Sequence, residues 1–336
     1  MSAIIVAELS ANHNGNIKNA IETIKAAKRA GADAIKFQTY TAETMTLNSH
    51  MSDFKITQGT LWDGQYLYDL YQKAYTPWEW HDELFRVARE EGILCFSTPF
   101  DKTAVDFLET LRNPIYKIAS FEITDISLIE YAAKKMKPMI ISTGIAMLED
   151  IELAVNTCRS VGNNNVTLLK CTSSYPAPIE DANLCMIPDL ARRFTVKSGL
   201  SDHTLGSISA ITAIALGATM VEKHFIIDRS MGGPDAAFSM NEEEFKQMVK
   251  DIRDVEKSIG EIRYELTDKM KVGREFSRSL YIAEDIKEGD VLTTQNVKSV
   301  RPGYGLHPKF LKDVIGKKVN QDLKKGMRLD LGYIVQ

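Results

Sequence analysis

Polar side chains gather at the ends of the short apolar runs in this sequence. Among them are two lysines, Lys36 and Lys117, and several residues with hydroxyl groups. Two ammonium groups among hydroxyls suit a doubly anionic ligand that bears a phosphate. One polar residue at the end of a strand is usually only solvated, whereas a converging set indicates a binding site. The residues at these positions are Glu8, Lys36, Gln38, Thr98, Lys117, Ser120, Glu122, Ser142, Thr143, Ser173, Tyr175, Ser201, Asp202, His203, Glu222 and His224.

Two histidines, His203 and His224, end consecutive apolar runs and could reach one ion from adjacent loops. Neutral imidazoles, together with carboxylate or water oxygens, suit Mn²⁺, Zn²⁺ or Co²⁺. A structural pair, in which each ring bonds to the backbone, fits the sequence equally well. Glu8 follows the first run, where a solvated carboxylate is the simpler interpretation. Beside a metal ion and two lysines, however, it would stay ionised and could act as a general base.

The elements that must position these residues are short strands that alternate with amphipathic stretches. Most of the candidate strands are continuous apolar runs, as expected of parallel strands covered on both faces. Eight strand-plus-helix units in about 260 residues predict a (β/α)8 barrel, with its chemistry at the carboxyl ends of the strands. A doubly wound sheet is the alternative, but no candidate strand is followed by a phosphate-binding glycine motif. The candidate strands are residues 3–8, 34–38, 94–97, 115–119, 138–142, 167–170, 195–199 and 219–223.

Two connecting segments have features of their own. Residues 39–76 form a long connection without a strong helical period, and they carry Trp62. Loops of this length are usually lids or binding loops. Residues 241–260, in contrast, place apolar side chains at helical spacing. Asn241 and Glu244 can form a capping box at the start of this helix, and Gly260 suits its end.

Composition excludes several classes of protein. The chain has 336 residues, of which 44% are hydrophobic and 26% charged, with a net charge of −4. These are ordinary globular values, and the charge does not draw the chain to nucleic acid or to an anionic membrane. The first residues read as a strand, not a signal peptide, and no apolar run is long enough to span a membrane. The 4 cysteines include no C-x-x-C pair. We therefore expect a soluble, cytoplasmic enzyme with no nucleic-acid or membrane partner.

The character of the sequence changes after residue 265. We expect a barrel at residues 1–265, a linker at 266–277 and a small, mostly β domain at 278–336. The pattern D-[IL]-K-x-G-x-x-L occurs at 285–292 and again at 322–329, and each copy predicts a turn around a glycine with positive φ. A domain of about 60 residues is marginal alone, so it should pack on another surface.

Several segments resemble the sialic acid synthase family, whose members make nonulosonic acids. These are AELSANHNG at 7–15, AIKFQT at 34–39, YKIAS at 116–120, GLSDHT at 199–204, VEKHF at 221–225 and GPD at 233–235. RPG at 301–303 matches the arginine motif of the family's C-terminal antifreeze-like (SAF) domain. GTLWDGQ at 59–65, AYTPWEWH at 74–81 and GPDAAFS at 233–239 look like the branch of the family that makes pseudaminic acid.

This resemblance implies a (β/α)8 TIM barrel joined to an SAF domain, in a domain-swapped homodimer. It also implies the condensation of phosphoenolpyruvate (PEP) with an open-chain 2-acetamido sugar, with loss of phosphate by C–O cleavage. In the branch just mentioned, the sugar is 2,4-diacetamido-2,4,6-trideoxy-L-altrose. The implied cofactor is a divalent metal cation, Mn²⁺ or Mg²⁺, with Co²⁺ as a further candidate.

Matched position by position, the resemblance implies that His203 and His224 bind the metal, and that Glu8 handles the proton of the attacking water. The implied PEP-binding residues are Lys36, Thr98, Lys117, Ser120, Ser142 and Ser201. The implied sugar-binding residues are Gln38, Glu122, Tyr175, Asp235 and, from the partner's SAF domain, Arg301. Ser173 departs from the sialic acid members, which more often carry asparagine there. An N-acetylneuraminate or legionaminate synthase is the alternative enzyme, and a glycan-binding protein on a retired barrel is the alternative outside catalysis.

Overall fold

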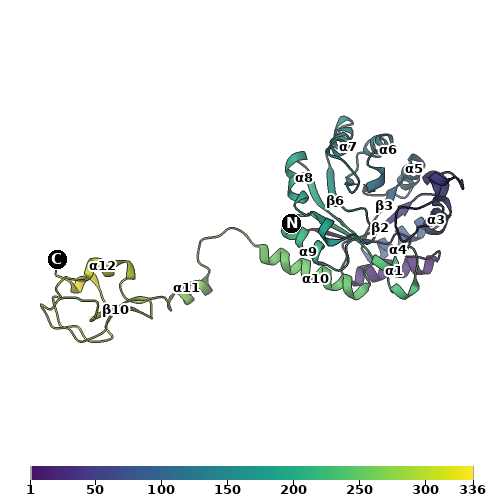
Figure 1. Cartoon of the computed structure of the whole chain (residues 1–336). Helices are drawn as coiled ribbons and strands as arrows, with labels where there is room; N and C mark the ends of the chain where they lie inside the picture. The colour runs from purple at the N-terminus through teal and green to yellow at the C-terminus, as the bar shows by residue number, and fades with distance from the viewer. Residues whose placement is uncertain (1, 336) are drawn as a thin grey trace. The chain divides into compact units, whose positions relative to one another are not determined.

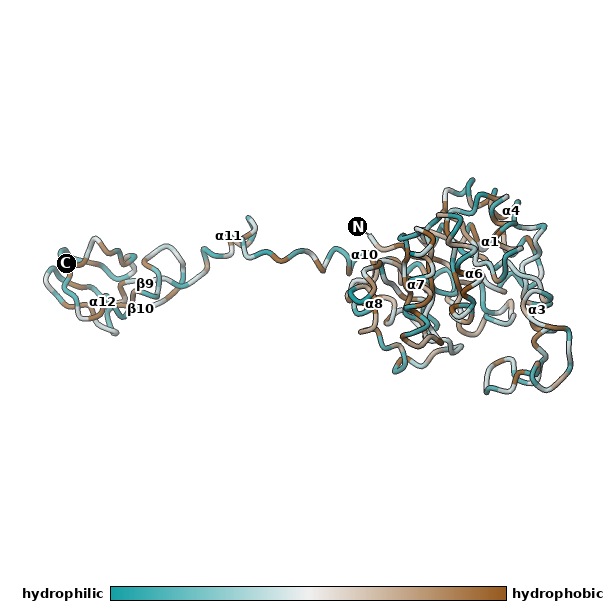
Figure 2. The backbone as a smooth tube through the Cα atoms, turned by 90° about the horizontal axis from the view of Figure 1, so that it is seen from above, coloured by the Kyte–Doolittle hydropathy of each residue, from teal (hydrophilic) through white to brown (hydrophobic). Residues whose placement is uncertain are grey.

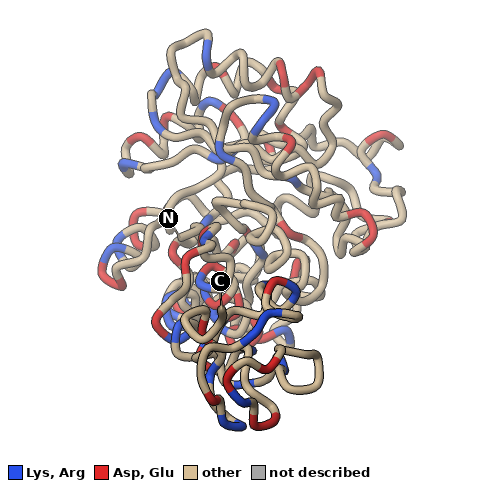
Figure 3. The backbone as a smooth tube through the Cα atoms, turned by 90° about the vertical axis from the view of Figure 1, so that its left-hand side faces the viewer, with Lys and Arg blue, Asp and Glu red and all other residues tan. Residues whose placement is uncertain are grey.

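The structure of the chain is a computed structural model that describes residues 2–335. The chain divides into two compact units, Met1–Gly260 and Glu261–Gln336, and each is described by itself (Figure 1). Basic and acidic residues are interspersed along the backbone (Figure 3). Within residues 2–335, none of the helices combines the length and the apolar character needed to cross a membrane.

The first unit is a closed barrel of eight parallel strands within the described residues, in which β1 pairs with both β2 and β8. The strands are β1 Ile4–Glu8, β2 Ala34–Thr39, β3 Leu94–Pro99, β4 Tyr116–Ile118, β5 Met139–Ser142, β6 Val166–Cys171, β7 Lys197–Asp202 and β8 Met220–His224. Each overlaps one of the candidate strands, so the predicted barrel is confirmed and the doubly wound sheet is excluded.

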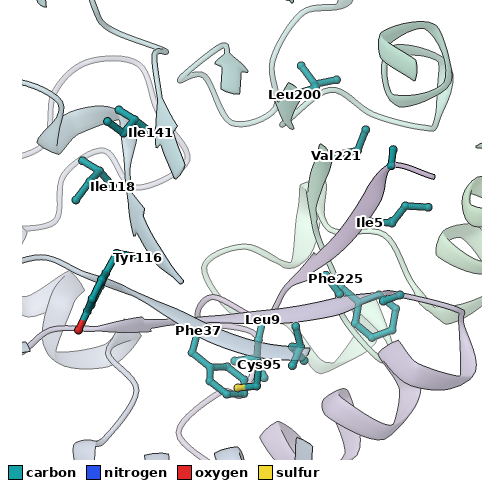
Figure 4. Packing of buried hydrophobic residues seen from close by; sticks show 14 of the residues in the cluster. Ile5, Leu9, Phe37, Cys95, Tyr116, Ile118, Ile141, Leu200, Val221 and Phe225 are labelled. Atoms are coloured by element: carbon teal, nitrogen blue, oxygen red, sulfur yellow. The ribbon is translucent and has the colours of Figure 1, made fainter. Parts of the chain in front are cut away.

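Helices cover the outside of the barrel. They are α1 Ile17–Arg29, α4 His81–Glu91, α5 Lys102–Thr110, α6 Ile126–Ala133, α7 Leu148–Ser160, α8 Met186–Phe194, α9 Ile208–Ala215 and α10 Glu242–Ile259. Hydrophobic and hydrophilic residues mix along them (Figure 2), because each helix buries one face. The main core lies between helices and strands, where the outward side chains of Ile5, Phe37 and Val221 are fully buried (Figure 4).

Helix α10 begins and ends where the sequence predicts. The Asn241 side chain accepts a hydrogen bond from the Glu244 amide at 3.0 Å, and the Glu244 carboxylate accepts one from the Asn241 amide at 3.0 Å. Gly260 follows the helix with φ of +57°. The capping box and the glycine together stop the helix from fraying at either end.

The interior of the barrel is layered. Six inward side chains form an apolar floor, which consists of Val6, Ala34, Phe96, Ile140, Leu169 and Met220. Residues two positions apart in a strand point to the same face. The next inward residue on each of these strands is polar or a thiol, and Lys117 follows at the same spacing after Ile115, which packs against the floor. These seven residues form the polar layer: Glu8, Lys36, Thr98, Lys117, Ser142, Cys171 and Glu222. The polar layer therefore lies next to the floor, at or near the carboxyl ends of the strands.

The long connection after β2 contains more regular structure than the sequence indicates. It holds α2 Ala42–Met45, the 3₁₀ turn Ser52–Phe54 and α3 Leu67–Ala74. Between them, Lys55 and Tyr66 form an antiparallel bridge, and the Ile56 amide donates to the Gln65 carbonyl at 2.9 Å. Residues 57–64 thus form a closed tip, which is a short hairpin-like excursion and not an open coil.

The second unit has its own apolar core around Leu280, Leu292 and Leu323. It contains α11 Asp268–Arg274, the antiparallel pair β9 Ser279–Ile282 and β10 Val297–Val300, and α12 Leu311–Val314. Helix α11 lies within the predicted linker 266–277, so that segment is not extended throughout.

The two copies of the near-repeat contact each other crosswise. Lys287 Nζ donates to Asp322 at 2.7 Å, and Lys324 Nζ donates to Asp285 at 2.9 Å. Ile286 and Leu323 pair between the two ion pairs as an antiparallel bridge. The glycines of the two copies have φ of +86° and +88°, as the sequence predicts for both turns.

Candidate active site

Four charged side chains meet in the polar layer at the mouth of the barrel. Lys117 Nζ lies 3.0 Å from Glu222 Oε1 and 3.3 Å from Oε2. Lys36 Nζ contacts Glu8 Oε2 and lies 3.6 Å from Glu222 Oε1. All four side chains are buried. The structure thus brings together both predicted lysines, and it adds Glu222 as their common partner.

Electrostatics separates the two carboxylates. Burial favours the neutral acid at Glu222, but the ammonium groups of Lys117 and Lys36 outweigh it and hold the pKa of Glu222 at about 2. At Glu8, burial outweighs the attraction of Lys36, and the pKa of Glu8 is raised. Glu222 is therefore the fixed counter-charge of the two lysines, and Glu8 is the carboxylate better suited to take up and release a proton.

Two of the predicted hydroxyl groups contact the charged side chains directly. Thr98 Oγ1 accepts from Lys36 Nζ at 3.2 Å, and Ser201 Oγ donates to Glu222 Oε1 at 3.3 Å. Ser120 Oγ accepts from the Gly144 amide at 3.0 Å. Ser142 Oγ is buried and has no hydrogen-bond partner among residues 2–335. A buried hydroxyl without a partner is costly in a folded protein, so Ser142 is a donor ready for a bound ligand.

Gly144 allows this hydroxyl cluster to close up after β5. A Cβ atom at this position would lie 2.2 Å from Ser173 Oγ and 2.8 Å from Ser120 Oγ. A side chain here would force both serine hydroxyls to move, so glycine lets the loop approach the two serines as they stand. Its backbone N–H donates to Ser120 Oγ, which fixes the loop against that serine.

The two histidines face each other at the rim, with ring centroids 5.4 Å apart. His203 Nδ1 lies 2.9 Å from the carbonyl oxygen of Thr172, which can only accept, so Nδ1 carries the proton and the lone pair is on Nε2. A hydrogen bond from the far nitrogen to a carbonyl is the usual support of a metal-binding imidazole. His224 Nδ1 is buried and lacks a hydrogen-bond partner in the part of the chain that the structure describes.

These two rings fit a divalent cation as an incomplete set of ligands. Residues 2–335 contain no group of three or more His, Cys, Asp or Glu side chains arranged to hold an ion. Water or substrate oxygens would have to complete the coordination, as in catalytic sites that keep positions open. Burial and the neighbouring His203 lower the pKa of His224 well below its usual value, which keeps that ring neutral, as a ligand must be. At His203, burial is outweighed by Cys171 and the Thr172 carbonyl, which raise its pKa, so a cation would bind there in competition with a proton.

Four further predicted residues lie around this centre. Gln38 Nε2 donates to Glu8 Oε1 at 3.3 Å, and Asp235 Oδ2 lies 3.8 Å from His224 Nδ1. The Tyr175 ring packs 4.3 Å from that of His203. Burial raises the pKa of Glu122 to about 7, and its Oε2 has no hydrogen-bond partner within residues 2–335.

Of the remaining predicted positions, Asp202 lies outside this group and Arg301 belongs to the second unit. Asp202 points away from the barrel interior, where it accepts from Lys223 Nζ at 2.6 Å. This buried ion pair holds the outer face of β7 against β8. Arg301 follows β10 in the second unit and is exposed there.

The loop after β1 fastens the loop after β8. Asn12 Nδ2 donates to the Phe225 carbonyl at 2.9 Å and to Ser239 Oγ at 2.8 Å. Asn14 Nδ2 donates to the carbonyls of Met231 and Gly232 at 3.1 and 2.9 Å. The fastened loop carries Asp235, so the two asparagines hold that carboxylate beside His224.

Sequence reasoning named Glu222 at a strand end without giving it a role, and gave Cys171 no role at all. Glu222 shares a strand face with His224, so the two-residue spacing was an available signal. Cys171 Sγ lies 3.7 Å from His203 Nδ1, and it offered no signal beyond its place two residues after Leu169. The aromatic neighbours of Tyr175, Trp62 and Phe238, were also missed as site residues.

Comparison with known proteins places this site in a family. The model of the NeuB family matches residues 23–264, and that of the SAF domain matches residues 277–327. A pseudaminic acid synthase of Helicobacter pylori is 51% identical over 95% of this chain and 94% of its own. An N,N'-diacetyllegionaminic acid synthase of Legionella pneumophila is 34% identical over 98% of this chain and 94% of its own. The crystal structure of an N-acetylneuraminic acid (sialic acid) synthetase from Leptospira borgpetersenii aligns with a TM-score of 0.73 and 30% identity, over 82% of this chain and 91% of the other.

Proposed function

The chain belongs to the NeuB family, and we propose that it is a pseudaminic acid synthase. In this reaction PEP, water and 2,4-diacetamido-2,4,6-trideoxy-L-altrose give pseudaminic acid and inorganic phosphate. The observation that carries the proposal is the pair of buried lysines in the polar layer, directly below two facing imidazoles. The lysines suit the two anionic groups of PEP, and the imidazoles suit a cation beside a sugar aldehyde.

PEP would bind in the polar layer. Lys36 and Lys117 would hold its carboxylate and phosphate, in place of part of their present contact with Glu8 and Glu222. The same ammonium groups stabilise the charge that develops as phosphate leaves. The hydroxyl donors of this site would be Thr98, Ser120, Ser142 and Ser201.

Two bonds form at PEP and one breaks. C3 of PEP attacks the aldehyde carbon of the open-chain sugar, and the aldehyde oxygen takes up a proton to become a hydroxyl. Water adds to C2 and gives a proton to Glu8, whose raised pKa favours that transfer. The bond between C2 and the phosphate oxygen then breaks, phosphate leaves with the electron pair, and the C2 hydroxyl passes its remaining proton to the departing phosphate as C2 becomes a ketone. His203 and His224 would hold a divalent cation, Mn²⁺ or Mg²⁺. This cation would act as a Lewis acid and polarise the aldehyde oxygen.

The sugar would lie above PEP, toward the rim. Gln38, Glu122, Tyr175 and Asp235 would contact it there, which agrees with their places around the imidazoles. We propose Arg301 as a further contact, supplied by the second unit of a partner chain in a domain-swapped homodimer.

Two observations support a dimer of this kind. The loops and helix starts after β5, β6 and β7 expose several large apolar side chains, which a second protein surface could cover. These are Ile145, Met147, Leu148, Ile179, Met186, Leu205 and Ile208. The segment 261–277, with α11 helical and the rest extended, could span about 45 Å. We further propose that the chain divides by function into a barrel at 1–265, a linker at 266–277 and an SAF domain at 278–336, and that the enzyme acts in the cytoplasm.

A coupled assay tests the proposed function. Purified chain is incubated with PEP, Mn²⁺ and each candidate sugar, and both phosphate and nonulosonic acid are measured. We expect kcat/KM for the diacetamido sugar to exceed that for N-acetylmannosamine at least about 100-fold. The hydroxyl groups at C4 and C6 of N-acetylmannosamine would lose their hydrogen bonds to water in a site shaped for an acetamide and a methyl group. A preference for the legionaminate precursor or for N-acetylmannosamine would assign the chain to another branch. Absence of phosphate release with every sugar and metal would favour a glycan-binding protein.

A further inference from the structure

Residues 57–64 form a preorganised tip on the long connection after β2. The Asp63 carboxylate accepts from the amides of Gly59 and Thr60 at 2.9 and 2.8 Å, which closes the turn. Gly64, with φ of +90°, donates its N–H to the Ile56 carbonyl at 2.9 Å. These contacts fix the backbone around Trp62, so that its side chain is presented from an ordered turn.

Trp62 reaches from this tip to the site at the mouth of the barrel. Its indole Nε1 donates to the Pro234 carbonyl at 3.3 Å, one residue before Asp235. Its ring lies 5.7 Å from that of Tyr175. The Tyr175 ring lies 5.3 Å from Phe238, which in turn lies 4.9 Å from His224. We refer to Trp62, Tyr175 and Phe238 as the aromatic wall.

The aromatic wall offers an apolar surface beside the position proposed for the sugar. The one polar group of Trp62 is already bound to Pro234, so the rest of its ring can make only apolar or π contacts. Trp62 is half-buried, which leaves part of the ring free to meet a ligand. A hydroxyl group placed against such a surface loses its water without gaining a partner, whereas a methyl group gains burial.

We propose that Trp62 is a specificity-determining residue, which selects sugars that present methyl groups to the aromatic wall. This inference rests on the proposed function. The diacetamido sugar carries three methyl groups, one at C6 and one on each acetamide. N-acetylmannosamine has hydroxyl groups at C4 and C6 in place of the second acetamide and the C6 methyl. The aromatic wall would thus favour the diacetamido sugar over N-acetylmannosamine, a choice that the lysines and carboxylates of the polar layer cannot make.

The test compares Trp62→Ala and Trp62→Phe with wild type on the two sugars. We expect Trp62→Ala to lower kcat/KM for the diacetamido sugar about 10- to 100-fold, the range for losing a fitted apolar contact. For N-acetylmannosamine the change should stay within about threefold, so the selectivity ratio falls, and the KM for PEP should not move. Trp62→Phe keeps an aromatic face and should retain most of the selectivity.

Leu61→Ala is the matched control, because the neighbouring Leu61 side chain is 54% exposed. It should leave both sugars unchanged, and circular dichroism of all variants checks the fold. An equal fall for both sugars, or an unchanged ratio in Trp62→Ala, would overturn the role of Trp62 while leaving the proposed function intact. Wild-type enzyme that turns over neither sugar, or both equally well, would overturn the proposed function and this inference with it.

Discussion

Replacement of Glu222 by glutamine tests whether this one carboxylate holds Lys36 and Lys117 in place and keeps them charged. The pKa of Glu222 is about 2 in the fold, against an ordinary value of 4.5, because two ammonium groups outweigh the burial that opposes ionisation. This difference corresponds to about 3 kcal/mol of stability. Because the folded pKa is depressed, that stability is fully present above about pH 4.5 and is lost as the pH falls through 2. Breaking a buried ion pair costs a similar 3–5 kcal/mol, roughly.

Glu222→Gln should therefore lower the free energy of unfolding by about 3 kcal/mol at pH 7 and by about half as much at pH 3. Burial already lowers the pKa of Lys117, and loss of its partner should lower it further. A smaller fraction of Lys117 would then be charged, so the KM for PEP should rise, and more at pH 8 than at pH 6.5. Urea unfolding at pH 7 and pH 3 and phosphate-release kinetics at pH 6.5 and pH 8 measure these effects.

The control removes an equivalent ion pair from the surface. Glu83 pairs with Arg86 at 2.6 Å, and both side chains are at least 40% exposed. Glu83→Gln should lower the free energy of unfolding far less than Glu222→Gln does at pH 7, and about equally at either pH, because water screens the pair. If Glu222→Gln is no more destabilising than this control at pH 7 and leaves the KM for PEP unchanged, Glu222 does not organise the two lysines.

Three further outcomes are expected. His203→Ala and His224→Ala should each abolish phosphate release with little change in the melting temperature; near-normal turnover in metal-defined buffer would contradict the ligand assignment. Glu8→Ala and Arg301→Ala, each inactive alone, should recover about a quarter of wild-type activity when unfolded and refolded together, because half of randomly paired dimers are mixed and carry one intact site. A mixture that stays inactive although mixed dimers form would exclude the swap. Burial raises the pKa of Glu122 to about 7, so its ionisation costs the folded state stability as the pH rises from about 4.5 to 7. Glu122→Gln should therefore gain about 1–2 kcal/mol over wild type in urea unfolding at pH 8 relative to pH 5, and a gain independent of pH would show that this carboxyl is not desolvated.

The barrel could be predicted because its strands are buried on both faces. Such strands read as continuous apolar runs, and their order along the chain is also their order around the barrel. The predicted helix at 241–260 was confirmed for a local reason, since its capping residues and terminal glycine act within one turn. Both signals are carried by residues close together in sequence.

The partners of the charged residues could not be predicted in the same way. That Glu222 meets Lys36 and Lys117 depends on how β8 closes onto β1 and on the register of β2 and β4. The pattern of a single sequence shows which face of its strand a residue occupies, but it does not show the register of that strand against one that is distant in sequence. Trp62 posed a different problem, because its turn has clear local signals, whereas its contacts with Tyr175 and Pro234 join segments more than 100 residues apart.

The apolar floor has a consequence for traffic through the barrel. Its six side chains close the far end, so the polar layer communicates with solvent at the mouth alone. Lys36 lies one inward position below Gln38 on the same strand, which places the proposed PEP site deeper than the proposed sugar site. In a barrel that opens at one end, a ligand bound near the mouth blocks the path to a deeper site. If PEP and the sugar bind at these proposed sites, PEP would therefore have to bind before the sugar, and the product would have to leave before a phosphate held by the lysines could follow.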